Sequence, residues 1–416
     1  MSTPLPIKPR RKRRRSGTAK WHMSRAAVNL SIDEVYNLDD KECREILTEV
    51  RFGGPDTVRC PKCGTIDRHC WRALERRWKC SGCEKAFSLT SGTVFAWRKI
   101  RLQDLFAGAL LWLNSSAGQP ALQLKRNFNK TYNTAFTLQH KLREALVRGY
   151  NIGLLNGEIE MDVAHQSGRG ADEKRGRPQG KRANPDEPKE AADLSTTTNT
   201  SKVKRLQKQK REGQYDPDFH RKLPKDRRFF ITVRKRSGKR GEGAAGSRVA
   251  IGMLEDAKVA QSVIKKFIAK PESILNTDTA GAYKDEGGGF KGHRTVEHQK
   301  ELVGPEGQNN NLAEELNFRL DRAEHGIYLN LEPKYLLDYA VETAFRADTR
   351  RLPNGAVLRI MLGIALSVGL SEYWRGFTHG RHRAVELLDP LPRAAAPSGP
   401  AKGRDPFANA TRRPPR

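Results

Sequence analysis

Four of the six cysteines form two Cys-x-x-Cys pairs. Cys60-Pro61-Lys62-Cys63-Gly64 comes first, and Cys80-Ser81-Gly82-Cys83 follows it. Each pair can hold one side of a tetrahedral zinc ion while the residues between the pairs form a hairpin. We therefore predict a structural Zn²⁺ site with Cys60, Cys63, Cys80 and Cys83 as ligands. His69 and Cys70 are alternative ligands, but their place in the middle of the hairpin favours Cys70 as a packed thiol.

Oxygen donors stand at the ends of two predicted strands and on a later helix. Residues 157–162 alternate between polar and apolar, the period of a half-buried strand, and end on Asp162. A second strand, residues 273–278, ends on Asp278, and a helix over 310–322 carries Asn311 and Glu314 on one face. Such oxygens suit Mg²⁺. We predict that they hold Mg²⁺ or Mn²⁺ for in-line attack on a phosphodiester.

Each of these oxygen donors has an alternative interpretation. Glu160 shares a face with Asp162 and is an alternative first ligand. Asp278 could form an Asx-turn after its strand. Asn311 could be the N-cap of its helix, with Glu314 as the capping-box partner or as the true ligand.

The charge balance indicates a polyanionic partner. The 416 residues include 77 Lys and Arg against 48 Asp and Glu, a formal net charge of +29. This excess is self-repelling unless an anion neutralises it, so we expect DNA as the partner. The longest apolar run, residues 356–370, is shorter than the ~20 residues of a membrane span, and no signal peptide is recognisable. We expect no membrane association and a reducing bacterial cytoplasm, with the protein at the nucleoid.

Residues 99–150 have helical periodicity in three short segments separated by tight turns. This arrangement is typical of a helix-turn-helix DNA-binding domain, with the third segment as recognition helix. The residues expected to face DNA are Thr134, Thr137, His140, Lys141 and Arg143. The alternative is a three-helix packing unit without a DNA-binding role.

The remaining segments follow from composition and periodicity. Residues 1–30 are expected to form a disordered basic arm, and residues 31–98 the zinc ribbon with a helical lead-in capped at Ser31. Residues 151–350 run strand, strand, strand, helix, strand, helix, with a flexible insertion at 167–225. C-terminal helices are expected at 351–390 and a disordered tail at 391–416. The predicted fold is multidomain α/β, with a ribonuclease-H-like catalytic domain after the zinc ribbon and the helix-turn-helix.

From about Ser31 to Arg350 the sequence resembles the IS1595 (ISXO2-like) transposases. The cysteine pairs and Ser91-Gly92-Thr93-Val94-Phe95 match the N-terminal zinc ribbon of that family. The three catalytic positions of the family are matched by Ile159-Glu160-Met161-Asp162, by Thr277-Asp278 before Gly281 and Tyr283, and by Asn311-Leu312-Ala313-Glu314 before Gly326-Ile327-Tyr328. The resemblance implies a homo-oligomeric DNA transposase that binds terminal inverted repeats, cleaves strands and joins them to target DNA.

Three positions depart from the family pattern. Val163 stands where an acidic residue is usual, Asn317 where a tryptophan is expected, and Asp321 where a lysine is usual. The alternative to an active enzyme is therefore a transposase-derived DNA-binding protein or repressor with an inactive catalytic centre. Both alternatives predict zinc and DNA binding, and only the first predicts strand cleavage.

Overall fold

The computed structural model describes most of the chain between residues 21 and 389. The described residues are 21, 23–67, 69–166, 228–239, 242–253, 257–278, 288–296, 307–329, 331–383 and 385–389. The predicted insertion, the predicted C-terminal tail and most of the predicted basic arm lie outside them, as do Gly281 and Tyr283.

The helical lead-in consists of two short helices, α2 (Ile32–Asn37) and α3 (Asp40–Phe52). Each begins with a capping box. The Ser31 hydroxyl accepts a hydrogen bond from the backbone N–H of Glu34, whose carboxylate accepts from the N–H of Ser31. The cap predicted at Ser31 is confirmed, and Asp39 with Glu42 repeats it at the start of α3.

A small three-stranded sheet follows α3. Its strands are β1 (Cys70–Arg72), β2 (Arg77–Lys79) and β3 (Ala86–Phe87), paired antiparallel in that order. The rings of Trp78 and Phe87 stack at 5.6 Å, and Trp71 meets Trp78 edge-on at 4.8 Å. These aromatic rings supply the packing that so small a sheet cannot obtain from a core of its own.

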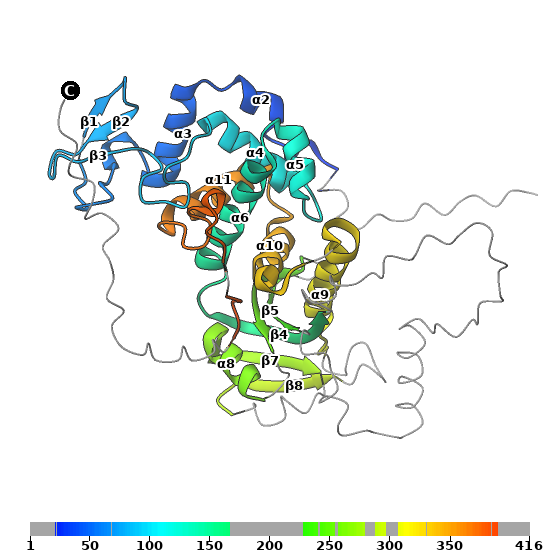
Figure 1. The fold of residues 1–416 in the computed structure, drawn as a ribbon. Coiled ribbons are helices and arrows are strands. Elements are labelled where there is room, and N and C mark those ends of the chain that lie inside the picture. Colours follow the sequence, from blue (N-terminus) through cyan, green and yellow to red (C-terminus); the bar gives the residue numbers. More distant parts are fainter. Residues whose placement is uncertain are drawn as a thin grey trace, which may run out of the picture.

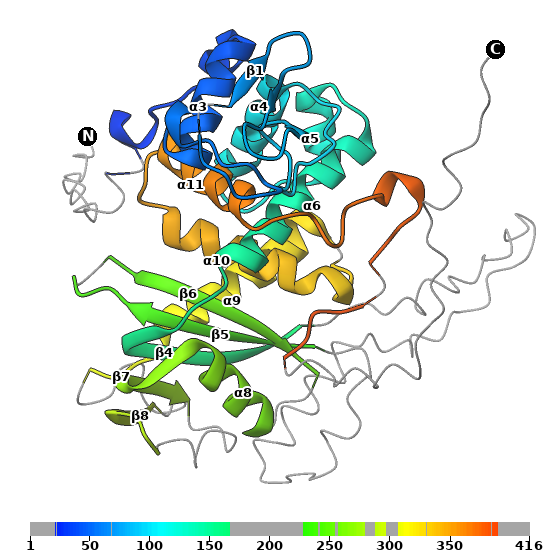
Figure 2. The same ribbon diagram turned by 90° about the vertical axis from the view of Figure 1, so that its left-hand side faces the viewer.

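Five further helices form a helical layer on the zinc-ribbon side of the large sheet, with α10 next to that sheet (Figures 1 and 2). They are α4 (Leu102–Asn114), α5 (Ala121–Phe128), α6 (Tyr132–Gly149), α10 (Leu336–Thr349) and α11 (Asn354–Ser367). Gly118, in the loop between α4 and α5, has φ +103°, and a Cβ there would lie 2.1 Å from the Tyr328 hydroxyl. Only glycine fits both the backbone and this close approach.

The large sheet has five strands in the order β6-β5-β4-β7-β8. Its strands are β4 (Leu155–Gln166), β5 (Arg228–Arg236), β6 (Ala244–Gly252), β7 (Ile268–Asp278) and β8 (Gly292–Val296). The first three form an antiparallel meander, and β7 and β8 run parallel to β4. Numbered along the chain, the strand order is third, second, first, fourth, fifth. The structure has the predicted order of three strands, a helix, a strand and a helix, with β8 as one more strand before the last helix.

Helices cover both faces of this sheet (Figure 2). On one face α8 (Ala257–Phe267) packs its Val263, Ile264 and Phe267 against the apolar side of β4, which carries Ile159 and Met161. On the other face lie α9 (Asn311–Ala323) and α10. The polar face of β4, with Glu160 and Asp162, therefore meets α9.

The helical layer and the large sheet share one hydrophobic core. Residues of α3, α4, α6, α10 and α11 belong to a single buried cluster that also includes Phe230 of β5 and Val249 and Ile251 of β6. The boundary expected between residues 150 and 151 therefore does not separate two cores. The expected C-terminal helices are represented by α11 and a 3₁₀ turn at Phe377–His379.

Candidate metal centres and nucleic-acid interface

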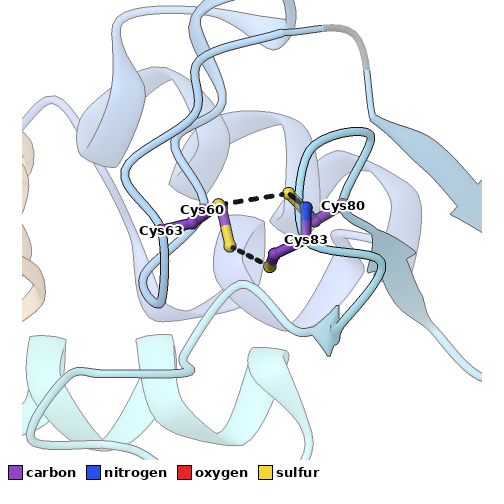
Figure 3. Close-up of side chains that lie close together, drawn as sticks. All are labelled: Cys60, Cys63, Cys80 and Cys83. Carbon is purple, nitrogen blue, oxygen red and sulfur yellow. Dashed lines mark hydrogen bonds between the residues drawn. The ribbon is translucent and has the colours of Figure 1, made fainter.

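The four predicted zinc ligands converge. The sulfur atoms of Cys60, Cys63, Cys80 and Cys83 all lie within 4.8 Å of one another (Figure 3). Across the two pairs, Cys60 Sγ lies 3.8 Å from Cys83 Sγ, and Cys63 Sγ lies 3.5 Å from Cys80 Sγ. Four thiolates at this spacing suit a closed, tetrahedral, structural Zn²⁺ site.

The knuckles around the cysteines are shaped by short contacts. A Cβ on Gly82 would lie 2.6 Å from the Thr65 hydroxyl, so the second knuckle can approach the first only with glycine there. Burial raises the pKa of Cys60 to about 11, whereas hydrogen bonds from Thr65 lower the pKa of Cys63 to about 6. Bound Zn²⁺ would hold all four as thiolates.

The alternative ligands of the hairpin do not belong to this centre. His69 is buried beside Phe87, and its Nδ1 lies 3.3 Å from the Ser81 backbone N–H. Cys70 is exposed in β1, so the expectation of a packed thiol was wrong. Because Cys70 lies on the outer side of a sheet with almost no core, it has nothing to pack against.

Asp162 and Asp278 lie on the same face of the large sheet. The prediction that the first strand ends on Asp162 was wrong, because β4 continues to Gln166 through its pairing with β5. In the parallel pairing of β4 with β7, Met161 is opposite Thr277, which places Asp162 and Asp278 at corresponding positions one residue further on. Residues opposite each other in a sheet point to the same side. Asp278 is half-buried at the end of β7.

Asp162 is held by an amide of α9. The Asn317 Nδ2 donates to Asp162 Oδ2 at 2.7 Å, and the Asn317 Oδ1 accepts from the Thr232 hydroxyl at 2.6 Å. Thr232 is the residue of β5 opposite Asp162. Asn317 thus fixes one oxygen of the Asp162 carboxylate, and the hydrogen bond from Thr232 in turn fixes the Asn317 amide.

Burial raises the pKa of Asp162 to about 6, and the negative charges of Glu314 and Asp278 add to the rise. Hydrogen bonds from the Val163 backbone and from Asn317 act in the opposite direction. Glu314 and Asp278 are therefore both near enough to repel the Asp162 carboxylate, which favours a cation beside it. Among the described residues, the carboxylate oxygens of Asp162, Asp278 and Glu314 do not form a cluster as close as that of the four cysteine sulfurs.

Glu160 has a structural role next to this site. Its Oε2 accepts hydrogen bonds from the backbone N–H groups of Leu312 and Ala313, at 2.7 and 3.3 Å, and its Oε1 accepts from Arg236 at 2.6 Å. A carboxylate at this position caps the first turn of α9 and interacts favourably with the helix dipole. Glu160, the alternative first ligand, is thus engaged in placing α9.

The first turn of α9 presents the remaining oxygen donors. Asn310 is the N-cap residue and makes no side-chain cap, so the interpretation of Asn311 as N-cap was wrong. Asn311 is the first residue of the helix, and both it and Glu314 are exposed. The buried Arg234 anchors this turn, because it donates to the Leu312 carbonyl at 2.8 Å and pairs with Glu315 at 3.3 Å.

Two stretches of the chain match models of known protein families. Residues 196–348 match the ISXO2-like transposase domain, and residues 38–86 match the transposase zinc-ribbon domain. Two separate stretches of the chain are thus similar to two domains of IS1595-type transposases. The zinc-ribbon match includes all four cysteines of the cluster, strands β1 and β2, and the first residue of β3. The transposase-domain match includes Asp278, Asn311 and Glu314, and Asp162 joins them through the pairing of β4 with β7. No curated protein and no solved structure matched the chain.

Two of the α6 residues expected to face DNA are covered by the rest of the protein. His140 and Arg143, expected to face DNA, are fully buried. His140 stacks on Trp374 at 4.2 Å, and Arg143 pairs with Glu342 of α10 at 2.6 Å. The prediction failed for these two residues because helical periodicity located one buried face of α6 and gave no sign that the opposite face is covered by α10 and the C-terminal segment.

The other residues predicted to contact DNA on α6 are also partly covered. Thr134 is half-buried and its hydroxyl lies 2.9 Å from that of the N-cap residue Thr131. Thr137 and Lys141 are half-buried, and burial lowers the pKa of Lys141. A more exposed surface lies on α5, whose outward residues are Gln123, Lys125, Arg126 and Asn127. Among the described residues, no helix is long and apolar enough to span a membrane.

Sequence reasoning missed the partners that place the oxygen donors. Asn317 was noted only as a departure from the family pattern, and Arg234 and Arg236 were not singled out. The alternation that put Glu158, Glu160 and Asp162 on one face was the available signal, since buried carboxylates require partners. The partners themselves come from β5 and α9, and no local pattern specifies them.

Proposed function

We propose that the protein is a metal-dependent transposase that cleaves DNA strands at the ends of an IS1595-like element and transfers them to target DNA. One observation carries the proposal: Asp162 and Asp278 take corresponding positions on the adjacent parallel strands β4 and β7, on the face covered by α9, whose first turn presents Asn311 and Glu314. The strand order, third-second-first-fourth-fifth, supports a ribonuclease-H-like fold for this domain.

The donor set fits divalent cations. It consists of hard oxygen ligands, and the Asp162 carboxylate, whose pKa is raised by burial and further by the charges of Glu314 and Asp278, would gain from a nearby cation. Two Mg²⁺ or Mn²⁺ ions at this site would activate the attacking water or 3′-hydroxyl and stabilise the leaving oxygen. Asp162 would contact both ions, Asp278 one, and Asn311 or Glu314 the other. Because ions in such sites lie about 3.5–4 Å apart, ligands of different ions need not converge as tightly as the cysteines do.

The chain's own residues then have distinct tasks. Asn317 holds Oδ2 of Asp162 and leaves Oδ1 to approach the ions. Glu160 and Arg234 keep the first turn of α9 against the sheet, so that Asn311 and Glu314 stay over the strand ends. Orienting oxygen ligands through a second set of hydrogen bonds is a general requirement of metal sites.

The net charge of +29 supports DNA as the substrate. We place the sequence-reading surface on the zinc ribbon and on the outward face of α5, with Lys125 and Arg126, in place of α6. Two copies of the chain are expected to act together, because an element has two ends. The protein would accordingly act in the cytoplasm, in association with the nucleoid.

The test is a strand-cleavage assay on DNA that contains the element's terminal sequences, with Mg²⁺ or Mn²⁺. We expect nicking at the ends by the wild type and none by Asp162→Asn or Asp278→Asn, both of which should still bind the DNA. Parallel assays of Asn311→Ala and Glu314→Gln separate the two candidates for the third ligand, because the true ligand alone is essential. Zinc and DNA binding without any nicking would instead support the inactive DNA-binding protein.

A further inference from the structure

Helix α9 exposes an aromatic side chain one turn beyond the oxygen donors. Phe318 is 54% exposed, and the guanidinium of Arg322 lies 4.4 Å from the centroid of its ring. Glu314, Phe318 and Arg322 are spaced by four residues, so they lie in one line along the surface of the helix. The rise of 1.5 Å per residue puts Phe318 about 6 Å from Glu314 along the axis.

A cavity of about 390 Å³ lies beside this line. It is bounded by α9, α10, the π-helical turn Glu324–Tyr328 and the loop between α4 and α5. The residues that matter for recognition are Phe318, Arg319, Arg322, Tyr328 and Arg346. The volume lies within the range of sites that enclose a small organic group.

The cavity is electropositive. Its two carboxylates have arginine partners: Glu315 lies 2.7 Å from Arg319, and Glu342 lies 2.7 Å from Arg346. Among the described residues no carboxylate lies within 4.0 Å of Arg322, which is exposed. Arg322 is therefore available to an anion from outside, next to an aromatic ring that can stack on a planar group.

These features match an unpaired nucleotide. A base stacks on an aromatic face or a guanidinium, and its phosphate pairs with an arginine. Successive nucleotides of a strand are about 3.4 Å apart, so the 6 Å between Glu314 and Phe318 spans roughly two of them. A strand whose phosphate reaches the oxygen donors would thus present a neighbouring base to this cavity.

We propose that the cavity between α9 and α10 receives an unpaired nucleotide of the DNA end, with its base stacked on Phe318 and its phosphate held by Arg322. The inference rests on the proposed function, because it is the cleavage site that brings a strand to α9. Taking a base out of the stack costs little at a frayed or single-stranded end, so the site would favour DNA that is already unpaired beside the scissile phosphate.

The test uses full-length, zinc-loaded protein without added Mg²⁺ and two DNA duplexes. One is blunt, and the other carries a short single-stranded overhang with 2-aminopurine, whose fluorescence falls when it stacks on an aromatic ring. For the wild type we expect quenching and about tenfold tighter binding of the overhang duplex than of the blunt one, within the range of one base–aromatic stack. Phe318→Leu should remove both effects, Arg322→Gln should reduce the preference, and Phe318→Tyr should retain both.

Trp97 provides the matched control. It is 66% exposed and lies under the guanidinium of Arg375 at 4.3 Å, but on a different segment of the chain. Trp97→Leu should leave the quenching and the preference unchanged. Equal binding of the two duplexes by the wild type, or quenching that persists in Phe318→Leu, would overturn the proposal.

The outcome is separable from that of the proposed function. Quenching needs no catalysis, so Asp162→Asn should show it as strongly as the wild type. Phe318-dependent quenching without any nicking by the wild type would refute the transposase chemistry and leave the nucleotide site standing. Nicking without Phe318-dependent quenching would support the transposase chemistry and refute the nucleotide site.

Discussion

Replacing Asp162 by asparagine should stabilise the protein when no divalent cation is present. Burial and two neighbouring carboxylates raise the pKa of Asp162 from 3.8 to about 6. A rise of roughly two pH units corresponds to about 3 kcal/mol, at about 1.4 kcal/mol per unit. The folded state binds the proton more tightly than the unfolded state does. The charged carboxylate therefore destabilises the fold at every pH above about 6, and this cost disappears below about pH 4.

The expected result is a free energy of unfolding about 3 kcal/mol higher for Asp162→Asn than for the wild type at neutral pH, or a melting temperature higher by several degrees. The difference should shrink as the pH falls through 6. Millimolar Mg²⁺ should raise the stability of the wild type by mass action and leave the variant almost unchanged.

Thermal unfolding followed by circular dichroism, at neutral pH and near pH 4, with and without Mg²⁺, measures all of these quantities. Glu158→Gln is the matched control, because Glu158 lies on the same face of β4 but is ion-paired with Arg236 at 2.5 Å. Neutralising it should bring no gain. A variant Asp162→Asn that is less stable than the wild type without Mg²⁺, or equally responsive to it, would refute the reasoning.

Three further predictions follow from particular contacts. Glu342→Gln should cost about 3–5 kcal/mol of stability, because it removes the charged partner of the buried Arg143, which lies 2.6 Å away; urea unfolding measures this loss. Arg143→Ala should likewise lower the stability, whereas the DNA affinity, followed by fluorescence anisotropy, should change little. Asn317→Ala should raise the pKa of Asp162 further, because a hydrogen bond to the charged form is lost, so the acidic limb of the pH–cleavage profile should move to higher pH; an unmoved limb would show that Asn317 does not hold the carboxylate. Metal analysis should find one zinc ion per chain in the wild type and none in Cys80→Ser, whose near-ultraviolet circular dichroism from Trp71 and Trp78 should also change. Cys70→Ser should change neither the zinc content nor the circular dichroism.

Local patterns were enough to predict the cysteine cluster and to place the two aspartates on strands. The cysteine spacing predicted a cluster that forms as expected, because a Cys-x-x-Cys knuckle is a short-range structure whose geometry depends on few other residues. The alternation over residues 157–162 predicted β4, and the parallel pairing with β7 then brought Asp278 to the same face. The order of strands and helices in this domain could likewise be predicted.

The burial of α6 depends on long-range packing and could not be predicted from the sequence. Residues Thr134 to Arg143 look like an exposed recognition helix because polar side chains alternate with apolar ones, yet α10 and the segment around Trp374 cover the polar face. The cover comes from residues about two hundred positions later in the chain, and no local pattern predicts it. Asn317 and Glu160 illustrate the same limit, since each acts through a partner on another element.

The central claim is that Asp162, Asp278 and the first turn of α9 hold divalent cations together. The most direct measurement is anomalous diffraction from crystals of the protein soaked with Mn²⁺. The account predicts peaks between the Asp162 and Asp278 carboxylates, with Asn311 or Glu314 within coordinating distance, and their loss in Asp162→Asn. Mn²⁺ bound elsewhere with this site empty, or bound equally well by the variant, would contradict it.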